Sequence, residues 1–157
     1  MNIKFLAIGK TDDERLKGMV ADYVKRLKHY LPFEMEVVPD LKNNKNLSEI
    51  QQKEAEGKLI LSRLALSDYV VLLDEKGKSF SSVGFSDWMQ KQLLAGRKNL
   101  IFLIGGPYGF SEEIYRRAQS NISLSEMTFS HQMVRLIFIE QLYRACTILK
   151  NEPYHHV

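Results

Sequence analysis

The sequence predicts a single α/β domain, residues 1–157, with a mostly parallel β-sheet flanked by helices. The hydrophobic pattern alternates five times between short β-rich runs and longer helical periods, as in α/β proteins. Two of the short runs, residues 70–73 and 101–104, are continuously apolar, as expected for strands covered on both faces. With 45% hydrophobic and 26% charged residues, the composition fits one ordinary globular domain.

We expect five strands, and the first begins almost at the start of the chain. They are predicted at residues 3–8, 33–38, 69–74, 100–104 and, with the weakest signal, 122–124. The first run has no small-residue cleavage site after it, so we interpret it as a strand and not as a signal peptide. No apolar stretch approaches the roughly 20 residues of a membrane span. We therefore expect a cytoplasmic protein, and a single cysteine, Cys146, agrees with a reducing compartment.

Two helices are predicted between the first and third strands. After the first strand, apolar residues recur at spacings of three and four, which indicates a helix that Thr11 or Asp12 caps. After the second strand, Ser48 and Gln51 form the pattern of a capping box. The second helix is therefore expected to begin there and to continue through about residue 64.

Two further helices are predicted around the fourth strand. Ser81 or Ser82 begins a helix that ends at Gly96. Ser111, followed by two glutamates, begins another, because acidic side chains suit a helix N-terminus.

The last predicted helix, residues 131–150, is the longest and the most apolar. One side carries Val134, Ile137, Phe138 and Leu142, and another carries Leu136, Ile139, Tyr143 and Cys146. A helix that is apolar on two sides needs two partners, and an exposed second stripe would promote aggregation. The second partner could be another subunit, so the pattern favours a homodimer.

Ligands of open parallel sheets bind beyond the carboxyl ends of the strands, which directs attention to three segments. These segments are residues 73–78, 105–109 and 125–131. Glycines at Gly105 and Gly106 allow a backbone to approach a ligand closely. We expect a binding site where the three segments meet.

Several familiar motifs are excluded. The 105–109 loop is not GxGxxG, and the Gly9-Lys10-Thr11 sequence lacks the earlier glycine of a phosphate-binding loop, since Lys4 stands there. No serine-hydrolase elbow, HExxH sequence or paired CxxC is present in the sequence, and we expect no metal. A phospho-receiver module would need a lysine after its fifth strand, but residues 128–130 of this chain are Thr-Phe-Ser. Asp12 is more simply interpreted as a residue at the start of a helix.

A second group of candidate residues lies near the C-terminus. Arg135 and Arg144 are nine residues apart on one helix and point in different directions, so one could be buried and the other could face substrate. Pro153 ends that helix, and it leaves Tyr154 and His155 in a tail that either frays or folds back over a pocket.

The segments singled out above resemble a known family. They are Leu73-Asp74, residues 104–109 (IGGPYG), 124–135 (LSEMTFSHQMVR), 140–145 (EQLYRA) and the tail 153–155 (PYH). Together they resemble the RlmH family of ribosomal RNA large-subunit methyltransferases, which belongs to the SPOUT superfamily. The resemblance implies a C-terminal trefoil knot, a homodimer and no membrane.

The resemblance also implies an activity and a cofactor. Members of the family use S-adenosylmethionine to methylate N3 of a pseudouridine in the 23S ribosomal RNA of the assembled ribosome. The cofactor site carried over to this chain comprises Leu73, Gly105, Gly106, Leu124, Ser125, Glu126, Met127, Thr128 and Phe129.

Catalytic roles remain open among five residues. His155 or His131 could act as the base that removes the imide proton, and Tyr154, Arg135 or Arg144 could stabilise charge on the ring oxygens. A formal charge of +3 allows an anionic partner, which two subunits would bind with combined basic patches. Two alternatives stay open, a nucleotide-binding regulatory module that uses the 105–109 loop and a noncatalytic ribosome-binding protein.

Overall fold

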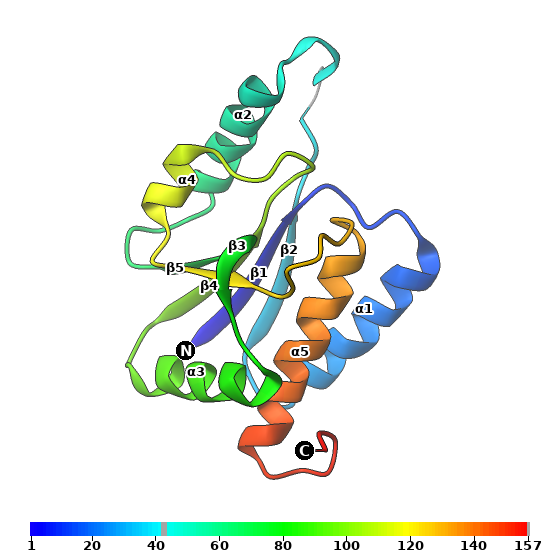
Figure 1. Ribbon diagram of the computed structural model, residues 1–157, viewed down its shortest axis with the longest axis vertical. Coiled ribbons are helices and arrows are strands. Elements are labelled where there is room, and N and C mark those ends of the chain that lie inside the picture. The colour runs from blue at the N-terminus through cyan, green and yellow to red at the C-terminus, as the bar shows by residue number, and fades with distance from the viewer. Residues whose placement is uncertain (42–43, 157) are drawn as a thin grey trace.

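The computed structural model describes residues 1–41 and 44–156 and contains one five-stranded sheet in which every pairing is parallel. The strand order is β2-β1-β4-β3-β5 (Figure 1). The strands are β1 (Asn2–Ile8), β2 (Phe33–Val38), β3 (Tyr69–Ser79), β4 (Asn99–Ile104) and β5 (Ser120–Ser123). The predicted parallel α/β class and all five predicted strands are confirmed.

In the described residues, four α-helices connect successive strands, α1 (Glu14–Leu27), α2 (Glu49–Leu61), α3 (Ser82–Leu94) and α4 (Glu112–Arg117), and α5 (Met133–Leu149) follows β5. The Ser48–Gln51 capping box of α2 is confirmed, and Ser81 and Ser111 are the N-caps of α3 and α4. The predicted cap of α1 is wrong. Asp13 occupies that position, because its carboxylate accepts the backbone N–H groups of Arg15 and Leu16.

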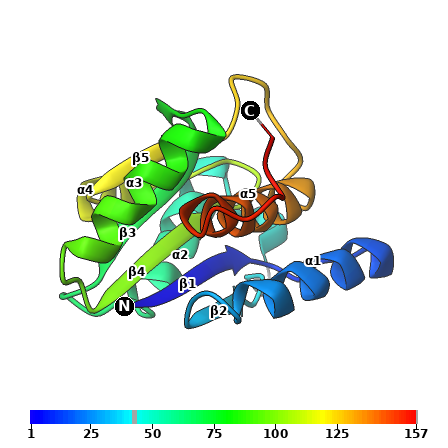
Figure 2. The same ribbon diagram turned by 90° about the horizontal axis from the view of Figure 1, so that it is seen from below.

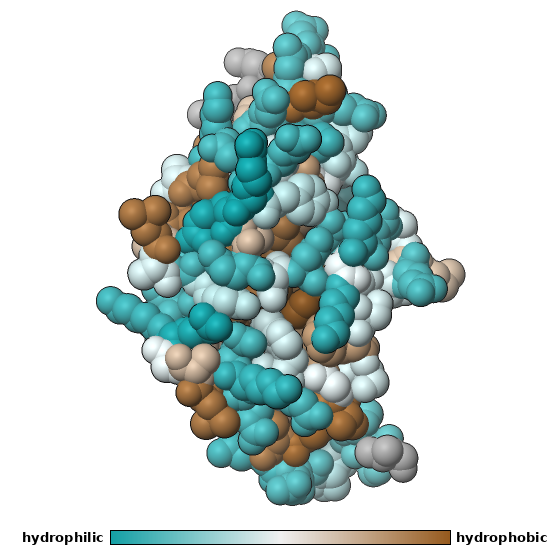
Figure 3. Space-filling model, turned by 60° about the vertical axis from the view of Figure 1, so that its left-hand side comes forward, coloured by the Kyte–Doolittle hydropathy of each residue, from teal (hydrophilic) through white to brown (hydrophobic). Residues whose placement is uncertain are grey.

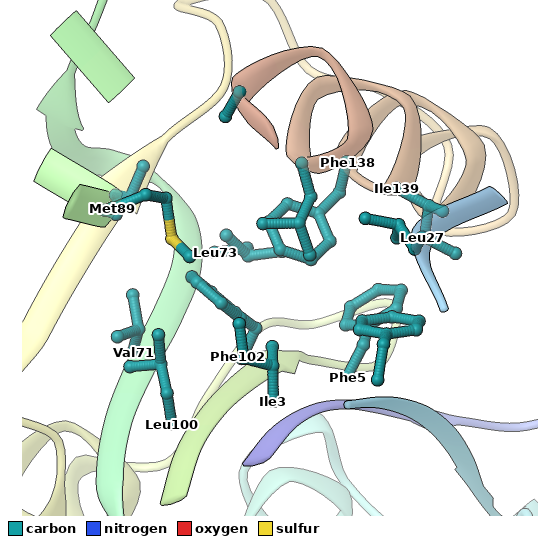
Figure 4. Close-up of a cluster of buried hydrophobic side chains, with 14 of the residues drawn as sticks. Ile3, Phe5, Leu27, Val71, Leu73, Met89, Leu100, Phe102, Phe138 and Ile139 are labelled. Atoms are coloured by element: carbon teal, nitrogen blue, oxygen red, sulfur yellow. The ribbon is translucent and has the colours of Figure 1, made fainter. Parts of the chain in front are cut away.

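The helices cover both faces of the sheet and make three layers (Figures 1 and 2). Helices α1, α3 and α5 pack on one face, where Phe5 and Phe102 lie against Phe138 (Figure 4). Helices α2 and α4 pack on the other face, through Ile60 and Ile114. Both sides of β1, β3 and β4 are therefore buried, which explains their continuous apolar sequence.

Helix α5 finds its two partners within the same chain. It begins at Met133, two residues later than predicted, and lies against the sheet between α1 and α3. Its two-sided apolar pattern is therefore explained without a second subunit. Cys146 is buried in this layer, as predicted, and burial raises the pKa of its thiol to about 12.

Strand β3 is longer than predicted and pairs with β5 twice. Leu73 pairs with Ile122, and after a register shift Lys78 pairs with the same residue. A Cβ atom at Gly77 would lie 2.6 Å from the backbone of Asn121, so only glycine allows this close crossing of β5. The shift places residues 74–76 beside the carboxyl end of the sheet.

The face drawn in Figure 3 is mostly hydrophilic and carries its hydrophobic side chains in separate patches. Scattered apolar residues of this kind are normal in folded proteins. Within residues 1–41 and 44–156, no helix is long and apolar enough to cross a membrane. In the same residues, no group of His, Cys, Asp or Glu side chains is arranged to hold a metal ion.

Candidate cofactor cleft and C-terminal tail

A cleft of about 510 Å³ opens at the carboxyl ends of β4 and β5, beside residues 73–76 within β3. Three segments line it, residues 73–76, 104–110 and 124–131, together with Tyr115 and Val134. These are the segments that the sequence singled out, because parallel strands bring their carboxyl ends to one edge of the sheet. Of the predicted cofactor residues, Leu73, Gly105, Gly106, Leu124, Ser125, Met127, Thr128 and Phe129 line the cleft. Glu126 is the exception, and it is exposed to solvent.

A tight turn follows β4 and forms one wall of the cleft. The N–H of Gly109 donates to the carbonyl of Gly106 at 3.1 Å, and Gly109 has φ +82°. A Cβ atom at Gly105 would lie 3.0 Å from the carbonyl oxygen of Gly109. Glycine is therefore required at these positions, and this wall combines their backbone groups with the side chains of Pro107, Tyr108 and Phe110.

The segment after β5 forms the opposite wall and is held by local hydrogen bonds. The hydroxyl of Ser123 donates to the carbonyl of Ser125 at 2.9 Å, and the Ser125 hydroxyl accepts the N–H of Met127 at 2.9 Å. Thr128 donates to the carboxylate of Glu75 at 2.7 Å, which links this wall to the end of β3. Met127 is 76% exposed, so the rim carries an apolar side chain that a ligand can cover.

Among the cleft residues that sequence reasoning missed is Tyr115 on α4. Its phenol donates a hydrogen bond to the carboxylate of Asp74. Burial raises the pKa of Tyr115, and the nearby Asp74 carboxylate raises it further, so the phenol keeps its proton. No sequence motif marks Tyr115, because its role depends on α4 lying above the end of β3.

Arg135 lies behind the cleft and does not line it. Its side chain is 1% exposed and donates to the carbonyls of Ile8 and Gly9, each at 2.7 Å, and to the Thr11 hydroxyl at 3.2 Å. Next to it, Gln132 donates to the carbonyl of Lys10 at 3.0 Å. Both side chains fasten the loop after β1 to the start of α5, so Arg135 is the buried one of the two arginines and the geometry gives it a positioning role.

The C-terminal tail is ordered and folds back on α5. Tyr154 donates to the carboxylate of Glu140 at 3.0 Å, and its ring packs edge-on against Tyr143 at 4.8 Å. Arg144 forms an ion pair with Glu140 at 2.5 Å and lies 3.3 Å from Nδ1 of His155. Burial and the hydrogen bonds to Tyr23 and Glu140 raise the pKa of Tyr154, so Tyr154 is a proton donor and not a base.

The predicted catalytic residues therefore fall into three places, the first of which is the buried position of Arg135 behind the cleft. His131 lines the cleft, whereas Arg144, Tyr154 and His155 form a separate group, the tail cluster, farther along α5. His131 and Arg144 are thirteen residues apart, which corresponds to about 20 Å along a helix. Figure 1 shows the C-terminus beyond the end of α5 that is remote from the sheet edge with the cleft. The tail cluster does not reach the cleft of its own chain.

The fold and the cleft define a class of protein: an α/β protein with a cleft of ligand size between backbone loops at the carboxyl edge of a parallel sheet. The family model described as "Predicted SPOUT methyltransferase" matches residues 1–155. This chain belongs to the SPOUT methyltransferase family.

Similar proteins carry a more specific name. The chain is 65% identical to the ribosomal RNA large subunit methyltransferase H of Flavobacterium johnsoniae, and the match covers 99% of each chain. It is 61% and 53% identical to the proteins of that name from Parabacteroides distasonis and Porphyromonas gingivalis, again over 99% of each chain. A probable methyltransferase from Bordetella pertussis has a similar fold, with a TM-score of 0.58 at 10% identity over 92% of this chain and 94% of that chain.

Proposed function

We propose that this chain methylates N3 of a pseudouridine in the 23S ribosomal RNA of the assembled ribosome, with S-adenosylmethionine as the methyl donor. The observation that carries the proposal is the cleft of about 510 Å³, in which three backbone loops meet. Relatives that match along almost the whole chain are named for methylation of large-subunit ribosomal RNA. A protein with this task works in the cytoplasm, where ribosomes are.

The cleft fits an adenosine-containing cofactor. It combines the glycine turn at Gly105 and Gly106, which offers backbone hydrogen-bonding groups, with apolar side chains at Leu73, Leu124 and Phe129. A purine needs flat apolar contact and a few polar partners, and both are present. When bound, S-adenosylmethionine supplies a sulfonium methyl group that is already electrophilic. The protein therefore has to align the methyl group with the target nitrogen and exclude water.

The target nitrogen must also lose its proton, and two histidines are candidates for the base. His131 lines the cleft of its own chain, and His155 lies in the tail cluster beside Arg144. We assign charge stabilisation to Arg144, whose pKa is raised by its hydrogen bond to Glu140 and which stays a cation. Tyr154 has an aromatic ring on which an RNA base can stack.

We infer that the active site is shared between two subunits of a homodimer. The tail cluster is remote from the cleft of its own chain, so a tail can act on a bound nucleotide only at the cleft of a partner. Met127 and Met133 are exposed near the cleft, which provides apolar surface for a second copy of the chain. The family resemblance further implies a trefoil knot in the C-terminal half.

Mixed dimers test the shared site. One variant carries Ser125→Trp, which fills the cleft, and the other carries His155→Ala, which removes a tail side chain. The two chains are co-expressed with different tags, and dimers that carry both tags are purified. Each parent dimer should be inactive on ribosomes that lack the modification. The mixed dimer should regain activity, since one cleft and one tail remain intact at the same site. An inactive mixed dimer would mean that the tail serves its own subunit.

Calorimetry separates the proposal from the two alternatives. The wild-type protein should bind S-adenosylmethionine and its demethylated product. Tight binding of ATP or NAD, with no heat from either proposed ligand, would favour a regulatory nucleotide-binding module. Binding to ribosomes without methyl transfer would favour a noncatalytic ribosome-binding protein.

A further inference from the structure

A buried carboxylate on α2 is not explained by the proposed reaction. Glu56 is 5% exposed and accepts a hydrogen bond from the side chain of Gln52 at 2.9 Å. Burial raises the pKa of Glu56, and Asp40 raises it further by repulsion. An apolar side chain would fill this position at a lower energetic cost, so the carboxylate needs another reason to be there.

Helix α2 is pressed closely against the connection between β4 and α4. A Cβ atom at Gly57 would lie 2.6 Å from the hydroxyl of Ser111, the residue that caps α4. Only glycine allows α2 to approach to this distance. This approach brings the neighbouring Glu56 beneath the glycine turn that forms one wall of the cleft.

The Glu56 carboxylate contacts the backbone of Gly106 directly. The N–H of Gly106 faces this carboxylate and lowers the pKa of Glu56, which partly offsets the effect of burial. A Cβ atom at Gly106 would collide with the carboxylate oxygens. Gly105 and Gly106 line the cleft but Glu56 does not, so the carboxylate lies behind the cleft wall.

This contact fixes the orientation of one peptide group. The N–H and C=O of a planar trans peptide point in opposite directions. Because the N–H of Gly106 points back to Glu56, the carbonyl oxygen of Gly105 points forward, toward the cleft. Two glycines make this peptide unusually free to rotate, so an external anchor is needed to hold it.

We propose that Glu56 is a positioning residue that holds the Gly105–Gly106 peptide with its carbonyl oxygen toward the cleft. The wall then offers a hydrogen-bond acceptor to a donor on the adenosine part of the cofactor, such as a ribose hydroxyl. Glu56 itself does not touch the ligand. This inference rests on the proposed function, because it assumes that the cleft binds an adenosine-containing methyl donor.

Three variants of α2 test the anchor, and the readout is the dissociation constant of S-adenosylmethionine and of its demethylated product by calorimetry. Glu56→Leu keeps the buried volume but removes the acceptor, and it should weaken both ligands about tenfold. Glu56→Gln should stay within about twofold of the wild type, because its amide oxygen still accepts the N–H. Glu54→Gln is the matched control, since Glu54 is exposed on the same helix. Thermal melting confirms that each variant is folded.

The outcomes separate this inference from the proposed function. If the wild type binds neither ligand, the proposed function fails. If the wild type binds and Glu56→Leu binds equally well, the anchor is wrong. If Glu54→Gln and Glu56→Leu weaken ligand binding equally, the proposed anchor is also wrong, because the effect would then come from the charge on α2 in general.

A double-mutant cycle gives a second test that does not depend on the leucine variant. Gly106→Ala should weaken ligand binding in the wild type, because the new methyl group meets the Glu56 carboxylate and displaces the turn. In a Glu56→Ala background the methyl group has room, so Gly106→Ala should add less than about twofold. Additive losses from the two substitutions would contradict the proposal.

Discussion

Replacement of Arg135 by methionine should destabilise the protein without removing a group that contacts substrate. The side chain donates two short hydrogen bonds, to the carbonyls of Ile8 and Gly9 at 2.7 Å, and longer ones to Thr11 and to the carbonyl of His131 at 3.2 Å. Methionine fills similar space but leaves these buried carbonyls without partners.

The size of the effect follows from those contacts. A hydrogen bond to a charged group contributes about 1.5–3 kcal/mol, so the two short bonds together contribute about 3–6 kcal/mol. Removing a buried charge also removes its desolvation penalty, which offsets part of this loss. We expect Arg135→Met to lower the free energy of unfolding by about 3 kcal/mol and the melting temperature by about 6–12 °C. Arg135→Lys should lose about half as much, because one ammonium group cannot reach both carbonyls.

Urea denaturation at fixed protein concentration measures this loss, with Arg116→Met as the control because Arg116 is exposed on α4. The control should change the free energy of unfolding by less than about 0.5 kcal/mol. Cofactor affinity of folded Arg135→Met should stay near that of the wild type. If this variant keeps full stability and loses methyl transfer, Arg135 acts on the substrate and the positioning role is wrong.

Three further predictions concern β3, α4 and α2. Gly77→Ala should destabilise the protein by about 2–3 kcal/mol, because its Cβ would lie 2.6 Å from the backbone of β5. The control Gly18→Ala should stabilise the protein slightly, because a Cβ atom there has nothing within 4 Å. Equal melting temperatures of the two variants would contradict the close approach of Gly77 to β5. Tyr115→Phe removes the hydrogen bond to the carboxylate of Asp74 and should weaken S-adenosylmethionine binding, measured by calorimetry, about threefold to tenfold. The melting temperature should not change. A variant that binds S-adenosylmethionine as tightly as the wild type would show that this contact does not shape the cleft. The pKa of Glu56 is higher in the folded than in the unfolded protein, so the folded state binds the proton more tightly. The stability that this group contributes is therefore present below its unfolded pKa and is lost as the pH rises through its folded pKa. The stability of the wild type relative to Glu56→Gln should therefore fall as the pH rises above the unfolded pKa of a glutamate, and a constant difference would show that the pKa of Glu56 is not raised.

The strands and the cleft could be predicted from sequence because both follow from short-range patterns. Continuous apolar runs such as residues 101–104 identify buried strands, and parallel strands bring the segments that follow them to one edge. The positions that sequence reasoning missed depend on long-range packing. Nothing in the sequence distinguishes Glu56 from other helix residues, because its contact with Gly106 depends on how α2 packs. In the same way, the contact of Tyr115 with Asp74 depends on the position of α4.

The C-terminal half shows where pattern analysis misleads. The two apolar sides of α5 suggested a second subunit, but α1, α3 and the sheet cover them in the same chain. The sequence left open whether the tail after Pro153 frays or folds back over a pocket. Tyr154 in fact packs against Tyr143 and donates to Glu140, so deletion of residues 154–157 should cost about 1–2 kcal/mol in addition to activity.

The most direct test is methyl transfer to ribosomes from cells that lack this protein. Assembled ribosomes are incubated with the wild-type protein and labelled S-adenosylmethionine, and the RNA is digested and analysed by mass spectrometry. We predict one methyl group per ribosome, on N3 of a pseudouridine in 23S ribosomal RNA, and none when Ser125→Trp fills the cleft. Label on another nucleotide, or no label from a protein that binds the cofactor, would contradict the proposed function.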